Sequence, residues 1–144
     1  MASYNKINQF TQDVCDGAHN FGSGGATYKV ELSNTATTAS NKLYGDISAN
    51  EVASGGGYTT GGASSAMSDS TASGTEKVLA TNVTWTGSGG GMGPFRYVTI
   101  YCSSQATPNK PLVCWFDYGS SISLNSGDTF TVSFDGTNGL FQMT

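Results

Sequence analysis

The chain has 144 residues, a formal net charge of −4, and only 11% charged residues. With six lysine and arginine residues in total, it lacks the basic face that neutralises phosphates, which argues against nucleic-acid binding. No apolar run approaches the ~20 residues of a membrane-spanning helix, and three cysteines are a poor basis for a disulfide framework.

Residues 3–19 are predicted to form the only helix, with Ser3 as its N-terminal cap. Apolar side chains recur at spacings of three and four, which gives the helix one apolar stripe. The helix either lies on the body of the domain or acts as an arm that docks on a neighbouring subunit. In the second case its candidate interface residues are Tyr4, Ile7 and Phe10.

After residue 27 the pattern changes to the alternation of half-buried strands, beginning with Tyr28, Val30 and Leu32. Residues 34–76 are weakly patterned and rich in small residues, with short strands expected within 42–47 and 58–67. Further strands are expected at 77–85, 95–102, 112–119, 122–124, 129–134 and 140–143, with turns at 125–128 and 135–139. This pattern predicts one domain over residues 1–144. The expected fold is an all-β, jelly-roll-like sandwich of about eight strands over 27–144, with one N-terminal helix or arm over 1–20.

The segments 95–102 and 112–119 are the most aromatic part of the chain, and we expect them to pair as an antiparallel hairpin. If Cys102 faces Cys114, then Ile100 faces Phe116 and Val98 faces Tyr118, all on one side of the sheet. That side is predicted to be the core, together with alternating residues near the end of the chain. The predicted core residues are Val98, Ile100, Phe116, Tyr118, Phe130, Val132 and Phe134.

The opposite side of this hairpin is too aromatic for simple exposure to solvent. It either covers the N-terminal helix, forms the core face of a second sheet, or is an intermolecular patch of the kind found at binding hot spots. Its candidate interface residues are Tyr97, Tyr101, Trp115 and Asp117. Cys102 and Cys114 are close enough for a bridge in this register, but in a reducing compartment we expect two buried thiols.

No combination of residues points to catalysis or to a metal or cofactor. His19, expected at the C-terminal end of the helix, lacks companions for either role. Asp117 is the one acid set among aromatics, where glycoside hydrolysis needs two carboxylates. The turn at 135–139 lacks the later glutamate of a calcium loop, and the glycine-rich run 87–93 lacks the Gly-Lys-Ser/Thr ending of a phosphate loop. Residues 1–20 lack the pattern of a secretory signal, so we expect folding in the cytoplasm.

An ordered set of segments resembles a family of small virion proteins of tailed phages. These segments are Met1-Ala2-Ser3-Tyr4-Asn5-Lys6-Ile7-Asn8-Gln9-Phe10, Gly93-Pro94-Phe95-Arg96-Tyr97 after Trp85-Thr86, Trp115-Phe116-Asp117-Tyr118-Gly119, Gly127-Asp128-Thr129-Phe130-Thr131-Val132 and Asp135-Gly136-Thr137-Asn138-Gly139. The resemblance implies a capsid cement (decoration) protein with a jelly-roll fold and no catalytic residues. Residues 34–76 depart most from this pattern.

From the resemblance we expect a protein made in the cytoplasm of a host bacterium and placed on the outer capsid of the virion. It would bridge and stabilise subunits of the major capsid protein and associate with itself, with a dimer favoured over a trimer. The alternative hypothesis is a carbohydrate- or receptor-binding module of a tail or fibre. Such a module would use Tyr97, Tyr101, Trp115 and Asp117 as a sugar platform.

Overall fold

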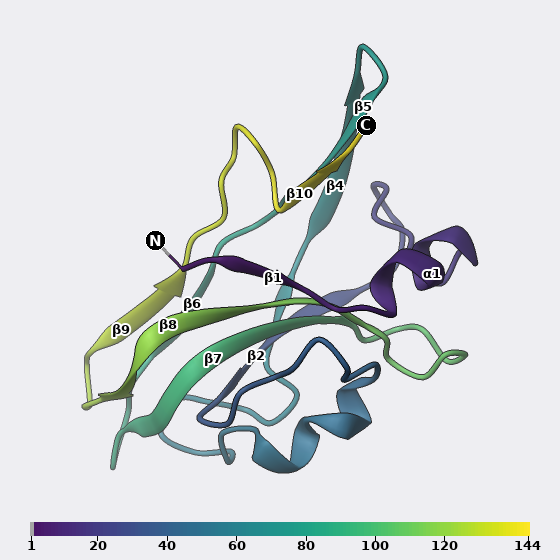
Figure 1. The fold of residues 1–144 in the computed structure, drawn as a ribbon. Helices are drawn as coiled ribbons and strands as arrows, with labels where there is room; N and C mark the ends of the chain where they lie inside the picture. Colours follow the sequence, from purple (N-terminus) through teal and green to yellow (C-terminus); the bar gives the residue numbers. More distant parts are fainter. Residues whose placement is uncertain (1) are drawn as a thin grey trace.

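Antiparallel strands make up most of the regular structure in the computed structural model, which describes residues 2–144 (Figure 1). The largest sheet has the strand order β1 (Tyr4–Lys6), β8 (Leu112–Leu124), β7 (Met92–Cys102), β2 (Tyr28–Ser33) and β3 (Ala63–Ser65). A second sheet contains β10 (Phe141–Met143), β5 (Thr75–Ala80) and β4 (Met67–Ala72), and a third pairs β6 (Val83–Thr86) with β9 (Thr129–Val132). The predicted all-β sandwich is confirmed, with ten strands among the described residues instead of about eight.

The N-terminal region differs from the long helix predicted over residues 3–19. Strand β1 pairs with the edge of β8, with Tyr4 opposite Phe116, and the helix α1 spans only Phe10–Cys15. The backbone N–H of Asn8 donates to the carbonyl of Ala39, which anchors the chain before the helix begins. Gly17, at φ 72°, ends the helix in the left-handed conformation that glycine tolerates. The apolar residues that fit helical spacing in the sequence are therefore divided between strand β1 and the short helix α1.

Strands β7 and β8 form the long hairpin at the centre of the fold. Val98 lies opposite Phe116 and Ile100 opposite Cys114, so the pairing is offset by two residues from the predicted register. An irregularity between Ile100 and Tyr101 changes the pairing by one further residue, so that Tyr101 lies opposite Leu112. Because side chains alternate with a period of two, a shift of two keeps each residue on its predicted side of the sheet. Cys114 does not face Cys102, and both thiols are free and buried.

One face of the large sheet packs against the layer that contains β6 and β9. The ring of Phe116 lies 6.5 Å from that of Phe134, and Phe130 packs edge-on against Phe95 at 4.9 Å. A pocket of about 270 Å³ remains between Val98 and Phe116 on one side and Phe130, Val132 and Phe134 on the other. The alternating residues near the end of the chain therefore complete this side of the sandwich.

The opposite face of the sheet is covered by residues 34–62, which we call the cover segment. It contains two short 3₁₀ turns, η1 (Tyr44–Asp46) and η2 (Ser48–Asn50), which lie below β7 and β2 in Figure 1. The hydroxyls of Thr37 and Thr99 share a hydrogen bond of 2.8 Å, and Tyr44 stacks on Tyr101 at 4.4 Å. The central part of this face is thus closed by the chain's own loop, which none of the three sequence-based interpretations anticipated.

The strands predicted within 42–47 and 58–67 are largely replaced by turns. The carboxylate of Asp46 accepts hydrogen bonds from the backbone N–H groups of Lys42 and Leu43. These bonds close a turn where a strand was predicted. In this part of the chain, the three residues of β3 pair with β2, and Glu51 forms an isolated bridge with Ser33. The turns predicted at 125–128 and 135–139 are present. In each of them an aspartate, Asp128 or Asp135, accepts hydrogen bonds from nearby backbone N–H groups.

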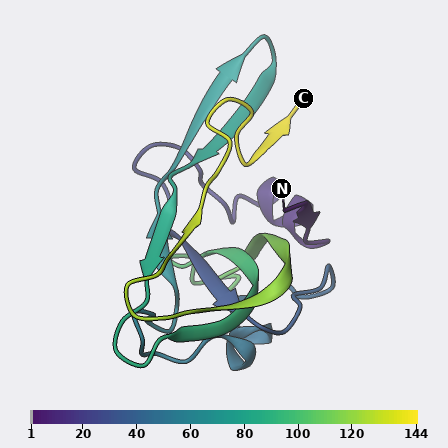
Figure 2. The same ribbon diagram turned by 90° about the vertical axis from the view of Figure 1, so that its left-hand side faces the viewer.

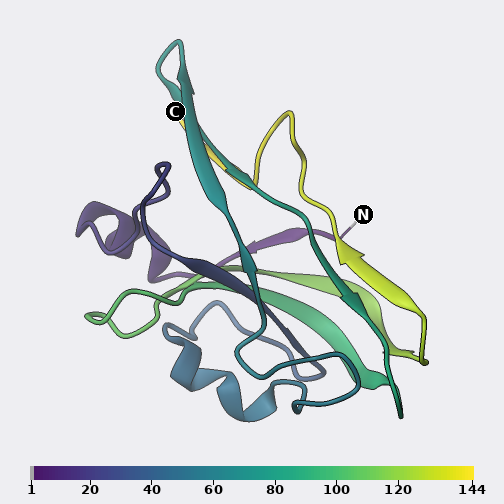
Figure 3. The same cartoon turned by 180° about the vertical axis from the view of Figure 1, so that it is seen from behind.

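Strands β4 and β5 form a hairpin that projects from the body, and residues 67–80 are called the arm below (Figures 2 and 3). Ser73 and Gly74 turn the chain with φ values of 50° and 79°, as two-residue hairpin turns require. Strand β10 lies along β5 from Val78 to Glu76, with Phe141 opposite Val78, so the end of the chain supports the arm on the side of its turn. No helix of the described residues is long and apolar enough to cross a membrane.

Candidate functional site

The candidate interface residues chosen from the sequence divide into buried and accessible groups. Ile7 and Tyr101 are buried in the core and unavailable to a partner, so their assignment to an interface was wrong, whereas Phe10 is buried but its side chain borders a groove on the surface. Tyr4 is 38% exposed because it sits on the edge strand β1. The remaining three, Tyr97, Trp115 and Asp117, are partly exposed.

One residue assigned to the core is instead on the surface. The side chain of Tyr118 is 54% exposed, although Val98 and Ile100 are buried and the other predicted core residues are partly buried. The cause is the irregular pairing of β8, in which Asp117 lies opposite Tyr97 but the next ordered pair joins Ile122 to Phe95. Tyr118 falls in the irregular stretch between these pairs.

Tyr97, Trp115 and Asp117 come together at the rim of the covered face. Asp117 forms a two-pronged ion pair with Arg96, with distances of 2.7 Å from Nε and 2.8 Å from the second guanidinium nitrogen. The hydrogen bonds from Arg96 hold the pKa of Asp117 below its ordinary value. A general acid needs a raised pKa, so Asp117 is unsuited to that role. The rings of Tyr97 and Trp115 meet edge to face at 6.2 Å.

Two carboxylates lie where the cover segment meets β2, the fully buried Glu31 and the partly buried Glu51, and sequence reasoning missed them. Glu51 accepts hydrogen bonds from the hydroxyls of Tyr44 and Tyr58, both at 2.5 Å, and from the backbone N–H of Gly61 at 2.7 Å. Glu31, on β2, is fully buried with neither carboxylate oxygen hydrogen-bonded within the described structure. Burial raises the pKa of Glu31 to about 8, although the nearby Thr99 hydroxyl opposes the rise and the charge of Glu51 adds a little to it. The bonds of the partly buried Glu51 join parts of the cover segment to one another, and the hydroxyl of Tyr58 also accepts a hydrogen bond from the backbone N–H of Leu32 on β2.

His19 is also part of the packing. The helix ends four residues before it, so the predicted position at a helix C-terminus was wrong. Its ring lies 5.1 Å from that of Phe10 and is stacked on Phe21 at 5.5 Å, with both ring nitrogens buried and unpaired among the described residues. Burial lowers its pKa from 6.5 to about 4. No group of three or more potential metal ligands occurs in residues 2–144.

Replacing His19 with phenylalanine should protect the fold from mild acid. The unfolded chain takes up a proton on His19 near pH 6.5, whereas the folded chain resists until about pH 4, so the stability that His19 contributes is complete above pH 6.5 and is lost as the pH falls to about 4. At ~1.36 kcal/mol per pH unit, the contribution of His19 falls by ~3 kcal/mol. Urea unfolding of both proteins at pH 7 and pH 4.5 measures this effect. An equal stability difference at the two pH values would contradict the expected result.

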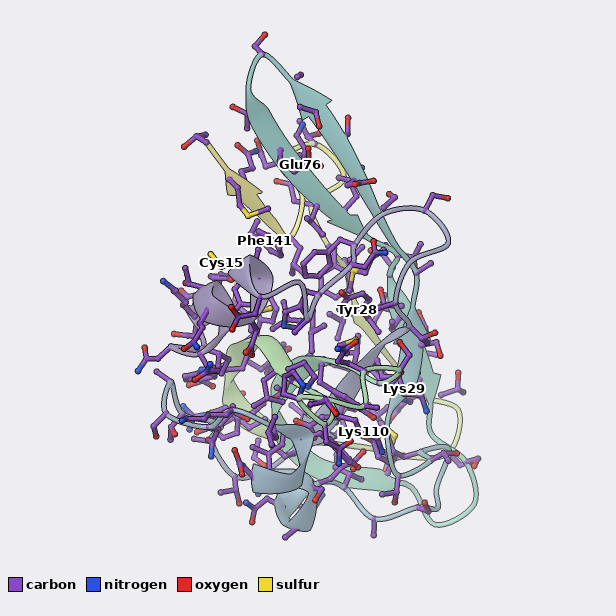
Figure 4. The ribbon with its side chains drawn as sticks, turned by 90° about the vertical axis from the view of Figure 1, so that its right-hand side faces the viewer. Cys15, Tyr28, Lys29, Glu76, Lys110 and Phe141 are labelled. Carbon is purple, nitrogen blue, oxygen red and sulfur yellow. The ribbon has the colours of Figure 1, made fainter. Side chains whose placement is uncertain are left out.

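An open groove lies where β1, α1 and β10 meet. It has a volume of about 350 Å³ and is called the β1–β10 groove below. Its lining residues are Tyr4, Lys6, Phe10, Thr11, Val14, Cys15, Phe141, Gln142 and Met143. Cys15 and Phe141 lie on the same side of the molecule near the foot of the arm (Figure 4). Together with the arm, this groove is the candidate surface for a macromolecular partner.

Comparisons of the chain with models of protein families, with curated proteins and with solved structures found no match. Function is therefore inferred from the fold, these surfaces and the sequence resemblance.

Proposed function

We propose that this chain is a structural virion protein that cements the outer capsid of a tailed phage. In this role it bridges subunits of the major capsid protein and stabilises them. The ordered set of segments that resembles small phage virion proteins supports the proposal from the sequence. The fold supports it through surfaces suited to contacts with neighbouring proteins.

The single observation that carries the proposal is the arm. Residues 68–72 of β4 are exposed to solvent, and the hairpin stands clear of the body in three views (Figures 1, 2 and 3). A two-stranded hairpin is only marginally stable by itself, and this one gains a third strand where β10 pairs with Val78, Lys77 and Glu76 of β5. An exposed strand edge is also a template for pairing with another chain. Contact with a neighbouring subunit accounts for such an arm.

A cement protein does not need a large contact at each copy. Many modest contacts on one shell reinforce one another through multivalency. The proposal includes self-association, with a dimer favoured over a trimer, and location on the outer surface of the virion. It assigns no role to nucleic acid, membrane or cofactor.

The carbohydrate-binding alternative is less well supported. Tyr101, one of the four residues expected to form a sugar platform, is buried beneath Tyr44. The carboxylate of Asp117 is already engaged by Arg96 and by the backbone N–H of Gly119. Of the expected platform, only Tyr97 and Trp115 are left as partly exposed aromatic residues.

The proposal is tested with purified particles of the phage that encodes the chain. Quantitative mass spectrometry should find hundreds of copies in each virion, and shells that lack the protein should bind it and become more resistant to heat. A handful of copies in each virion would indicate a tail or fibre protein. Failure to bind shells at micromolar concentration, together with unchanged stability of virions lacking the protein, would overturn the proposal.

Changes on the arm should weaken binding to the shell without unfolding the protein. Ser70 and Ala72 are exposed on β4, and replacing both with arginine should reduce the affinity for shells at least tenfold through bulk and charge. The matched control replaces Ser120 and Ser123, which are exposed on β8, with arginine. Sedimentation with shells measures binding, and thermal melts check folding. Equal binding by both double variants would exclude the arm from the contact.

A further inference from the structure

The β1–β10 groove concentrates exposed apolar surface. Three large hydrophobic side chains stand out as exposed in the described structure, and two of them, Tyr4 at 38% and Met143 at 39%, line this groove. The third, Tyr118, lies outside it. Apolar side chains gathered in one exposed groove are typical of a protein-binding surface, whereas isolated ones need no explanation.

Two free strand edges border the same groove. Strand β1 is the last strand of the five-stranded sheet, and β10 is the last strand of the three-stranded sheet. Each of them is paired on one side only, with β8 and β5 respectively. A free edge offers backbone N–H and C=O groups to an incoming extended chain, as in recognition by strand addition.

The two edges differ in how well they could accept a strand. Lysine is a residue with which proteins protect exposed edges, and β1 carries Lys6. The sequence of β10 is Phe-Gln-Met, without lysine or proline. Phe141 is fixed at the inner end of this strand, where its ring packs edge-on against Phe10 at 5.2 Å and Phe21 at 5.3 Å. The β10 edge is therefore both firmly held and unprotected.

We propose that the β1–β10 groove receives an extended segment of a capsid subunit, which adds a strand to β10 and inserts an apolar side chain between Tyr4 and Met143. This inference rests on the proposed function, and it assigns the capsid contact to a particular site. The strand edge selects an extended segment over a helix, and the apolar lining selects a segment with hydrophobic residues at alternate positions.

Substitutions at the rim of the groove test whether it carries the contact. Replacing Tyr4 and Met143 with lysine should weaken binding to shells at least tenfold, because an apolar insertion would then meet two charges. The matched control is Tyr118→Lys, which alters an exposed tyrosine outside the groove and should bind as the wild type does. If melts show that the double variant is unfolded, the single variant Met143→Ser replaces it. Wild-type binding by the folded groove variant would overturn this inference and leave the proposed function standing.

Cys15 provides a second measurement, because it lines the groove and is the exposed cysteine, whereas Cys102 and Cys114 are buried. Its alkylation by N-ethylmaleimide should slow at least tenfold in the shell-bound protein, and the backbone amides of β10 should exchange more slowly with deuterium. A photo-crosslinker attached to Cys15 should join one extended segment of the capsid subunit. An unchanged alkylation rate, or crosslinks only to a second copy of this chain, would overturn the inference. Failure of the wild-type protein to bind shells would overturn the proposed function as well.

Discussion

Replacing Glu31 with glutamine should remove the loss of stability that this carboxyl group contributes as the pH rises from 4.5 to about 8. The side chain of Glu31 is fully buried on β2, and its oxygens have no hydrogen-bond partner within the described structure. Burial therefore favours the neutral acid and raises its pKa to about 8. Glutamine has nearly the same shape and stays neutral at every pH in this range.

The direction of the effect follows from which state releases its proton first. The unfolded chain loses the Glu31 proton near pH 4.5, whereas the folded chain keeps it until about pH 8. The stability that this group contributes is thus complete below pH 4.5 and is lost as the pH rises through the folded pKa. At ~1.36 kcal/mol per pH unit, the total loss is ~5 kcal/mol, a large part of the stability of a typical domain.

Urea unfolding at pH 5, 7 and 9 measures this effect. The stability of Glu31→Gln relative to the wild type should increase steadily from pH 5 to pH 8 and then level off. Circular dichroism at pH 5 verifies that the variant keeps the fold. A constant difference between the two proteins across this range would show that Glu31 is ionised in the folded state.

Glu31 and His19 act in opposite directions. Between pH 4.5 and 6.5, deprotonation of Glu31 in the unfolded chain lowers stability as the pH rises, while loss of the His19 proton from the unfolded chain raises it. The two trends largely cancel, so the wild-type profile should be nearly flat in this interval. In Glu31→Gln the stability should rise with pH in this interval because His19 remains, and in His19→Phe it should fall because Glu31 remains. The two variants together therefore test the pKa shifts of both groups.

The hairpin shows what local sequence pattern can predict. Alternation placed Val98 and Ile100 on one side of the sheet and Thr99 and Tyr101 on the other, and the structure keeps this division. The register was missed by two residues because a shift of two satisfies the alternation equally well, so the pattern alone does not determine which residues pair. The irregular stretch of β8 that contains Tyr118 has no signal in the alternation either, which is why Tyr118 was assigned to the core.

The cover segment shows what local pattern cannot predict. Thr37 meets Thr99 across 62 residues of sequence, and Glu51 is enclosed by tyrosines from both sides of η2. Their partners are fixed only when the chain folds back on the sheet, so the weakly patterned sequence of this segment gives no sign of its role.

The helix predicted over residues 3–19 was wrong for a different reason. Tyr4 and Ile7 fit helical spacing, but pairing of β1 with β8 decided the conformation around Tyr4.

Replacing Gly62 with alanine should destabilise the protein by ~4 kcal/mol or more, because this glycine lets the cover segment approach β2. Gly62 has a φ of 70°, and a Cβ there would lie 2.0 Å from the carbonyl oxygen of Val30 and 2.9 Å from the Cα of Glu31. The closest contact is with backbone, which cannot rotate away as a side chain can. The chain must therefore separate from β2, and the packing over Glu31 must open.

Gly24→Ala is the matched control for this prediction. Gly24 has a similar φ of 76°, but a Cβ there would meet nothing within 4 Å, so only the cost of the left-handed conformation applies. That cost is about 1–2 kcal/mol. Urea unfolding should therefore rank the proteins as wild type, Gly24→Ala and Gly62→Ala in order of decreasing stability. Equal destabilisation by the two substitutions would mean that backbone conformation alone matters at Gly62. In that case the close approach of the cover segment to β2 would contribute nothing to holding Glu31 away from water.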